Sequence, residues 1–251
     1  MRTSSSPAAA ARCPPTHAEV RYKGIASSHK RPPETCAFAA ALGVVLLDDA
    51  TFHEGVNVDS FEVDRSLVLT PPAGEFTAMS YRVSSAEFAP PFRVVATVSE
   101  PAPFKVEILL RLRAEFPARH AAAGVSLCLP LPRCTSHASL SLAGGAPGAS
   151  PPPGQAAEYD DARKEVVWTL RKCQGGSEHT LRVRATLTQE RAGALRREVG
   201  PATLAFTIPS FNVSRLAVRY LQLLQRPQPG EAPPARWVRY ITTSSSYVCR
   251  F

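Results

Sequence analysis

Hydrophobic and polar residues alternate along much of this chain. The alternation is regular in residues 106–113 and 181–188, and shorter runs at residues 166–170 and 203–208 repeat it. A period of two is typical of a β-strand that buries one side and exposes the other. Segments rich in Pro and Gly separate these runs, and no segment of the sequence keeps a helical period. The pattern therefore predicts an all-β protein made of β-sandwiches, with almost no helix.

The composition agrees with this fold class and shows no sign of catalysis. The 251 residues include 24 Pro and 14 Gly, which suits many short strands joined by turns. The six cysteines lie far apart without a Cys-x-x-Cys pair, and the six histidines stand outside the known catalytic and metal-binding motifs. We expect reduced thiols, no metal or other cofactor, and no enzymatic activity.

The beginning of the chain has a different character. Residues 1–35 are rich in Ser, Ala, Pro and Arg and show no apolar periodicity. The apolar run at residues 36–47 has 12 residues, too few to span a bilayer, and suits a buried strand or a short helix. We expect residues 1–42 to form a disordered or divergent N-terminal segment.

The net charge favours an acidic partner. Lys and Arg outnumber Asp and Glu by 29 to 21, which gives +8 at pH 7. An anionic lipid surface or an acidic peptide fits this charge better than a nucleic acid, because the basic residues form no dense tract. The polar sides of two predicted strands hold the candidate lipid contacts, Arg111, Arg113, Arg182 and Arg184. The alternative is that scattered arginines only keep a β-protein soluble.

Five sequence blocks resemble a known family, in which they occur in the same order. They are residues 74–83 (GEFTAMSYRV), 91–94 (PFRV), 159–187, 200–224 and 237–251 (WVRYITTSSSYVCRF). These blocks are similar to the medium, or mu, subunits of clathrin-adaptor-type complexes. Residues 52–57, 70–75 and 129–136 most resemble the branch of the fourth adaptor protein complex.

The resemblance implies a mu homology domain, which is an elongated pair of β-sandwich subdomains with the second inserted into the first. Subdomain A would comprise residues 43–86 and 211–251, and subdomain B residues 87–210. The last strand would then return to complete the first sandwich, which suits a β-rich run at the end of the sequence. The family's assembly domain has no counterpart in this sequence, so we expect a partial chain that is truncated at the start of subdomain A.

The resemblance also implies a function. A mu subunit is the cargo-recognition subunit of a vesicle-coat adaptor and binds tyrosine-based sorting signals in the cytosolic tails of membrane proteins. It acts in intracellular protein transport with two large subunits and one small subunit. It is cytoplasmic and peripheral on trans-Golgi network or endosomal membranes and coated vesicles. The alternative is a basic module that binds anionic membrane lipids without peptide recognition.

The residues that match the family's peptide pocket lie near the end of the chain. They are Trp237, Val238 and Arg239 on one predicted strand, with Val218 and Leu221 on the strand before. A Tyr-x-x-Φ peptide would add beside these strands, with its phenol ring between the indole and the guanidinium group. Val218 and Leu221 are three residues apart, so a bulge or a bend of the backbone is required to place them on one face.

One feature weakens this predicted pocket, and an alternative role exists for two of its residues. The family's first strand, which supplies an Asp acceptor for the tyrosine hydroxyl, has no visible counterpart here, so we expect weak or absent binding by this chain alone. The alternative for Trp237 and Arg239 is that they only pack on the sheet.

A second candidate peptide site rests on Phe52, which matches a Phe that this branch of the family uses. The matching Arg position holds Ser80, and Arg82 would lie on the same face as Ser80 if the strand alternates regularly. The alternative is that Phe52 belongs to the core.

Overall fold

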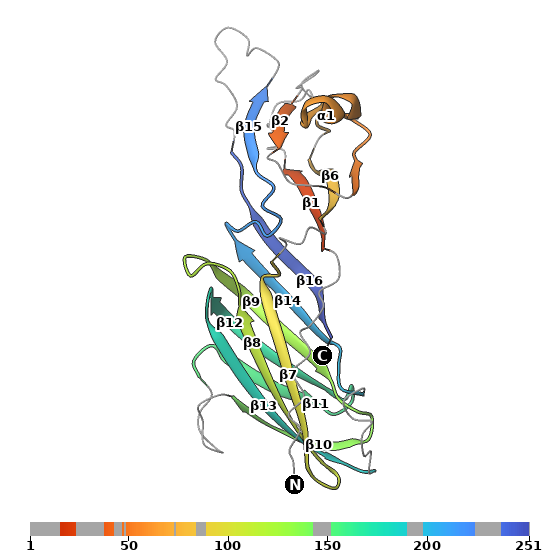
Figure 1. Cartoon of the computed structure of the whole chain (residues 1–251), viewed down its shortest axis with the longest axis vertical. Coiled ribbons are helices and arrows are strands. Elements are labelled where there is room, and N and C mark those ends of the chain that lie inside the picture. Colours follow the sequence, from red (N-terminus) through yellow and green to blue (C-terminus); the bar gives the residue numbers. More distant parts are fainter. Residues whose placement is uncertain are drawn as a thin grey trace, which may run out of the picture. The chain divides into compact units, whose positions relative to one another are not determined.

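A computed structural model describes most of the chain. The described residues are 16–23, 38–42, 47, 49–72, 74–83, 89–142, 152–189, 198–223 and 237–250, of which 16–23, 38–42 and 223 are described as backbone only. These residues form strands and a single short helix (Figure 1). Within this part of the chain, the helix has seven residues, and nothing has the length and hydropathy that a membrane-spanning helix needs. The predicted all-β fold class is confirmed.

The described chain divides into two compact units, called unit 1 and unit 2. Unit 1 contains Ala89–Phe211 and Tyr240–Phe251, and unit 2 contains Pro15–Phe88 and Asn212–Arg239. Each unit holds two β-sheets that share a core of its own, as in a β-sandwich.

Unit 1 has a four-stranded and a five-stranded antiparallel sheet. The first has the order β10-β13-β8-β7, from Thr135–Leu142, Glu178–Leu187, Lys105–Ala114 and Phe92–Ala102. The second has the order β11-β12-β9-β14-β16, from Gln155–Asp160, Glu165–Gln174, Ala121–Pro130, Ala202–Pro209 and Ile241–Cys249. Figure 1 shows β7, β8 and β13 in front of β9, β12 and β14.

The core of unit 1 lies between its two sheets. Ile108 and Leu181 enter it from the four-stranded sheet, and Leu127, Trp168 and Leu204 enter it from the five-stranded sheet, all without solvent exposure. Along β8, the even-numbered residues are buried and the odd-numbered ones are not, which is the predicted alternation. The period-two pattern of the sequence therefore reflects the alternation of buried and exposed side chains along the strands of this sandwich.

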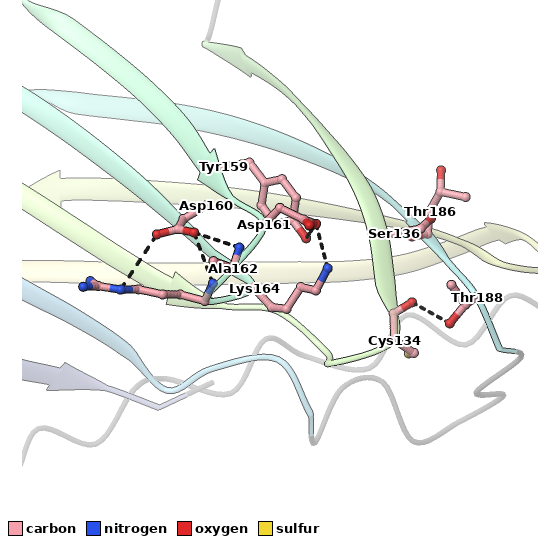
Figure 2. A network of polar contacts seen from close by, with 10 residues as sticks. Cys134, Ser136, Tyr159, Asp160, Asp161, Ala162, Lys164, Thr186 and Thr188 are labelled. Atoms are coloured by element: carbon pink, nitrogen blue, oxygen red, sulfur yellow. Dashed lines mark hydrogen bonds and ion pairs between the residues drawn. The ribbon is translucent and has the colours of Figure 1, made fainter.

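Hairpins at one end of unit 1 are fixed by polar contacts (Figure 2). Between β11 and β12, the Asp160 carboxylate accepts hydrogen bonds from the backbone N–H groups of Ala162 and Arg163, at 2.9 and 3.1 Å. The Lys164 ammonium donates to the Asp161 carboxylate at 2.6 Å, and this bond lowers the pKa of Asp161 and raises that of Lys164. The turn is thereby held in one geometry at the solvent-exposed end of the two strands.

Unit 2 has a three-stranded and a four-stranded sheet. The first has the order β1-β6-β3, from Thr16–Lys23, Glu75–Val83 and Asp49–Phe52. The second has the order β15-β2-β5-β4, from Val218–Leu223, Phe38–Leu42, Ser66–Leu69 and Val56–Asn57.

A small core and the helix α1, Val58–Asp64, complete unit 2. Asn57 caps the helix by accepting a hydrogen bond from the Ser60 N–H, and Phe61 is the helical residue that reaches the core. The buried hydroxyl of Tyr81 lies 2.6 Å from that of Ser214, and burial raises the pKa of Tyr81. This hydrogen bond joins two segments that lie 133 residues apart in the sequence.

The structure differs from the predicted domain boundaries in two places. First, residues 16–23 and 38–42, placed by the prediction in a disordered or divergent segment, form β1 and β2 of unit 2, while residues 1–15 and 24–37 lie outside the described residues. β2 pairs with both β15 and β5, so the apolar run at 36–47 contains a strand rather than a short helix.

The second difference concerns the last strand. The prediction assigned β16 to the first sandwich, subdomain A, whereas β16 pairs with β14 and belongs to unit 1. Its buried Cys249 is part of the unit 1 core, and Tyr247 packs against that core. The Tyr247 hydroxyl also donates a hydrogen bond to the Phe92 carbonyl, at 2.8 Å, across to the other sheet. These contacts explain why the strand belongs with unit 1.

Candidate peptide-binding site

Strand β15 is the outermost strand of its sheet in unit 2 and carries two of the predicted peptide-binding residues. The register with β2 shifts between Val218 and Tyr220, so the strand contains the bulge that the sequence required. Because of this extra residue, Val218 and Leu221 are both half-buried, and Val218 packs against the unit 2 core. Of the two predicted irregularities, a bulge or a bend of the backbone, the structure has the bulge.

The bulge also exposes an aromatic residue that the sequence reasoning missed. Tyr220 is 47% exposed on β15, directly between the two predicted positions. A regular alternation from Val218 would have turned Tyr220 inward, so only the bulge identifies it as a surface residue. The signal that could have found it is the bulge itself, which the spacing of Val218 and Leu221 already required.

The segment Trp237–Arg239, also in unit 2, is exposed. Trp237 is 60% and Val238 45% exposed, and Arg239 is also at the surface. The prediction put these three residues on a strand, but the structure describes them outside any strand, and β16 begins only at Ile241. None of the described strands pairs with residues 237–239; the ladder between β14 and β16 begins at Ile241. Strand alternation therefore does not decide which of their side chains share a face.

Phe52 faces the core of unit 2. It lies opposite the fully buried Met79 in the β3–β6 ladder, and its ring centroid is 4.8 Å from that of Phe61. Ser80 and Arg82 share a face, as predicted, but their alternation from Met79 places them on the opposite face of the sheet from Phe52. The structure therefore supports the core role for Phe52 and does not bring it together with Arg82.

The four predicted lipid contacts all lie on the outer face of the four-stranded sheet of unit 1, and all are exposed. Arg182 and Arg184 share one carboxylate, since their Nε atoms lie 3.4 and 3.2 Å from the same Glu107 oxygen. Arg111 has no ion pair to any residue that the structure describes. One carboxylate between two guanidinium groups leaves positive charge in excess on this face.

A fifth arginine completes this surface, which we call the basic face: Arg93, Arg111, Arg113, Arg182 and Arg184. Arg93 on β7 lies opposite Arg113 on β8, and both have Nε 3.4 Å from the same Glu115 oxygen. Sequence reasoning missed Arg93 because its neighbour on the sheet is 20 residues away, and only the strand pairing brings the two together.

Comparisons with known proteins point to one family. A model of the Adaptor complexes medium subunit family matches residues 21–251. The AP-4 complex subunit mu of Arabidopsis thaliana is 45% identical over 206 residues, which cover 82% of this chain and 44% of that protein. The AP-4 complex subunit mu-1 of Mus musculus is 34% identical over 212 residues, with 82% and 45% covered. The chain thus spans less than half the length of these curated relatives.

Solved structures share the fold at low sequence identity. The Fcho1 mu homology domain of Danio rerio with bound Eps15 peptide superimposes with a TM-score of 0.53 at 14% identity, covering 76% of this chain and 73% of that one. The yeast delta-COP-I mu-homology domain complexed with a Dsl1 WxWxV peptide gives a TM-score of 0.53 at 12% identity, with 75% and 74% covered. The fold of this chain is therefore that of a mu homology domain.

Proposed function

The chain belongs to the Adaptor complexes medium subunit family, and from this premise we propose that it recognises cargo for a vesicle coat. It binds tyrosine-based signals of the form Tyr-x-x-Φ in the cytosolic tails of membrane proteins. Two large subunits and one small subunit are its partners in the full complex. It works in the cytoplasm, at trans-Golgi network or endosomal membranes and on coated vesicles. The expectation that it is not an enzyme agrees with its family.

One observation carries this proposal: unit 2 exposes two of the predicted pocket residues, Trp237 and Val238, and also Tyr220, which lies on β15 between the predicted Val218 and Leu221. Large apolar side chains at a surface mark interaction sites, and an outer strand such as β15 offers main-chain groups to an extended peptide. Trp237 and Arg239 provide a stacking surface and a charged donor for a phenol ring. Val218 and Leu221, half-buried beside the bulge, contact the bulky Φ residue.

The proposal is tested by titrating the 251-residue chain with a Tyr-x-x-Φ peptide and following backbone NMR shifts. We expect saturable but weak binding, because neither β1 nor β2 carries the Asp acceptor of the family, and a buried tyrosine hydroxyl without this acceptor loses about 1–3 kcal/mol, or about fivefold to 150-fold in affinity. A peptide with Ala in place of Tyr is the control ligand. Equal responses to both peptides would reject the proposal.

Variants locate the binding surface. Trp237→Ala and Arg239→Ala should each abolish the response, while Val63→Ala, which removes an even more exposed apolar side chain from α1, should leave it unchanged. Binding that survives both substitutions at 237 and 239 would place the peptide elsewhere on the protein.

The basic face supports a second candidate function, which is contact with anionic membrane lipids. Its arginines outnumber the carboxylates that they share, and a charged leaflet stabilises each such residue by about 1 kcal/mol. Glu107→Gln should strengthen binding to vesicles of phosphatidylserine and phosphatidylcholine, because it releases Arg182 and Arg184. Flotation that is unchanged in this variant and insensitive to salt would argue against the lipid function.

A further inference from the structure

Strand β7 is an outer strand of unit 1. For each of its residues, the side to which the backbone N–H and C=O groups point can be assigned. Its register with β8 is regular from Phe92 to Ser99. The Pro91 carbonyl accepts a hydrogen bond from the Glu115 N–H at 2.9 Å, so it points toward the β8 side. The next carbonyl, that of Phe92, accepts from the Tyr247 hydroxyl and points the other way. Main-chain groups therefore alternate in direction from this point.

This alternation leaves a row of main-chain groups facing outward. Arg93 and Thr97 direct theirs to β8, while Val94, Ala96 and Val98 direct theirs away from it. Among the strands that the structure describes, β7 pairs only with β8, so nothing described there meets the outward row. The side chains of Ala96 and Val98 are also only half-buried at the margin of the core. Along this edge, therefore, the outward backbone groups meet no described strand, and the side chains at the margin of the core are only partly covered.

The other outer strands of unit 1 carry features that discourage pairing. The ladder of β10 shifts register between Thr135 and His137, and that of β16 shifts opposite Leu204 and Phe206. Strand β11 has six residues and ends at Asp160. Bulges, short length and charge are the usual protection of a sheet edge. Strand β7 also shifts register, between Ser99 and Ala102, where Pro101 stands, but its stretch from Val94 to Val98 is regular and uncharged, which marks this stretch as suited to receive a strand.

The charge beside this edge selects the kind of strand. Arg93 projects from β7 onto the outer face, and Arg111 and Arg113 follow on β8. A second copy of this chain joined at β7 would place two basic faces side by side, which like-charge repulsion disfavours. An incoming strand with acidic side chains on this face and aliphatic side chains on the other complements both surfaces of the edge.

We propose that β7 binds an extended peptide segment of a partner protein in which aliphatic and acidic residues alternate. The segment adds as an antiparallel fifth strand and exchanges main-chain hydrogen bonds with Val94, Ala96 and Val98. Its aliphatic side chains cover Ala96 and Val98, and its acidic side chains face Arg93 and Arg111. This site lies on unit 1 and uses no residue of the proposed tyrosine-signal site, so either can fail without the other.

The first test uses the peptide acetyl-Val-Glu-Val-Glu-Val-Glu-Val-amide with the 251-residue chain, and measures amide hydrogen exchange by NMR. The amides of Val94, Ala96 and Val98 should gain protection, while those of Arg93, Val95 and Thr97, already bonded to β8, should not change. Protection without this alternation, or no binding at about 1 mM peptide, would overturn the proposal.

Backbone methylation of the peptide supplies a matched control. In the added strand, residues whose side chains cover Ala96 and Val98 also direct their N–H groups to β7, whereas the glutamates direct theirs to solvent. N-methylation of the two inner valines should therefore weaken binding at least about tenfold, and N-methylation of the glutamates should weaken it far less. Equal loss in both peptides would exclude strand addition, as would binding that neither modification changes.

Variants of the chain test the same edge from the other side. Ala96→Pro removes an outward N–H without removing a bond to β8, so it should abolish binding while the fold is kept. Arg93→Glu should weaken binding about fivefold, and Arg163→Glu, at a somewhat more exposed arginine on the β11–β12 turn, should not. If Ala96→Pro fails to fold, the methylated peptides and Arg93→Glu decide. Dimerisation of the free chain through β7, seen by sedimentation, would contradict the proposed occupant.

Discussion

Units 1 and 2 each consist of two β-sheets around a core, but they differ in where their large apolar side chains lie. Unit 1 buries Trp168 completely between two sheets and presents a face of arginines. Unit 2 has a smaller core, yet it holds five of the seven large apolar side chains that stand exposed in the described chain: Val58, Val63, Tyr220, Trp237 and Val238. The difference separates two roles for similar residues, because a tryptophan in unit 1 stabilises the fold while one in unit 2 is available to a partner.

The largest expected effect contrasts the two tryptophans. Trp168→Ala should lower the free energy of unfolding of unit 1 by about 3–5 kcal/mol, because it leaves a cavity in a fully packed core. Trp237→Ala should change stability by less than about 0.5 kcal/mol, as expected of an exposed position. Urea unfolding followed by circular dichroism measures both values.

Trp168→Phe sharpens this comparison. The indole N–H of Trp168 is buried and has no hydrogen-bond partner among the described residues, so replacing it by an apolar ring costs less than a full truncation. A loss in Trp168→Phe as large as in Trp168→Ala would mean that the indole N–H does have a partner.

The next effect tests whether Phe52 belongs to the core of unit 2 or to its surface. Phe52→Ala should lower the free energy of unfolding of unit 2 by about 2–3 kcal/mol, since the half-buried ring packs on Phe61. Val63→Ala, at an 87% exposed position on α1, is the control and should have almost no effect. A stable Phe52→Ala protein that has lost peptide binding would instead support the second candidate site.

A smaller effect is expected at the polar link inside unit 2. Tyr81→Phe removes the hydroxyl that contacts Ser214 and should reduce stability by about 1–2 kcal/mol, because the buried Ser214 hydroxyl loses this partner. Tyr159→Phe removes a hydroxyl that donates to Asp161 at the surface of unit 1, and we expect a much smaller change there. Equal losses in the two variants would contradict the difference between a buried and an exposed hydrogen bond.

The smallest effect depends on pH and concerns unit 1. Burial lowers the pKa of His179 from its usual 6.5, so the unfolded chain takes up the proton first as the pH falls. The folded state should therefore be most stable above pH 6.5 and lose stability between that value and the lower folded pKa. His179→Gln should remove this loss, which urea unfolding at pH 7.5 and pH 5 would reveal. A wild-type and variant that respond identically to pH would show that His179 is not responsible.

The strands of unit 1 were predictable because apolar and polar residues alternate along each of them, and this local pattern matches the buried and exposed sides of the strand. Strands β8 and β13 occupy the predicted alternating runs almost residue for residue. The helix α1 was not predictable, since seven residues with one buried side chain make no helical period. Strand pairing was not predictable either: the match of β16 with β14 depends on contacts made far along the chain.

The same limit applies to the candidate site. The spacing of Val218 and Leu221 predicted a bulge, and the bulge is present. The exposure of Trp237 and the absence of a strand around it could not be read from an aromatic and β-branched run, because that run is typical of paired strands. Likewise, the sharing of Glu107 by two arginines depends on a register that no local pattern encodes.

The hydrogen bond from Tyr247 to Phe92 has a mechanical consequence. A tension applied across β16, from Ile241 toward Cys249, acts along the strand axis, so its bonds to β14 are sheared together and cannot open one after another. The tyrosine side chain near the loaded end fastens this strand to the opposite sheet as well. Strand β16 is therefore attached to both sheets of unit 1, and pulling it out requires breaking the Tyr247 hydrogen bond as well as the ladder to β14.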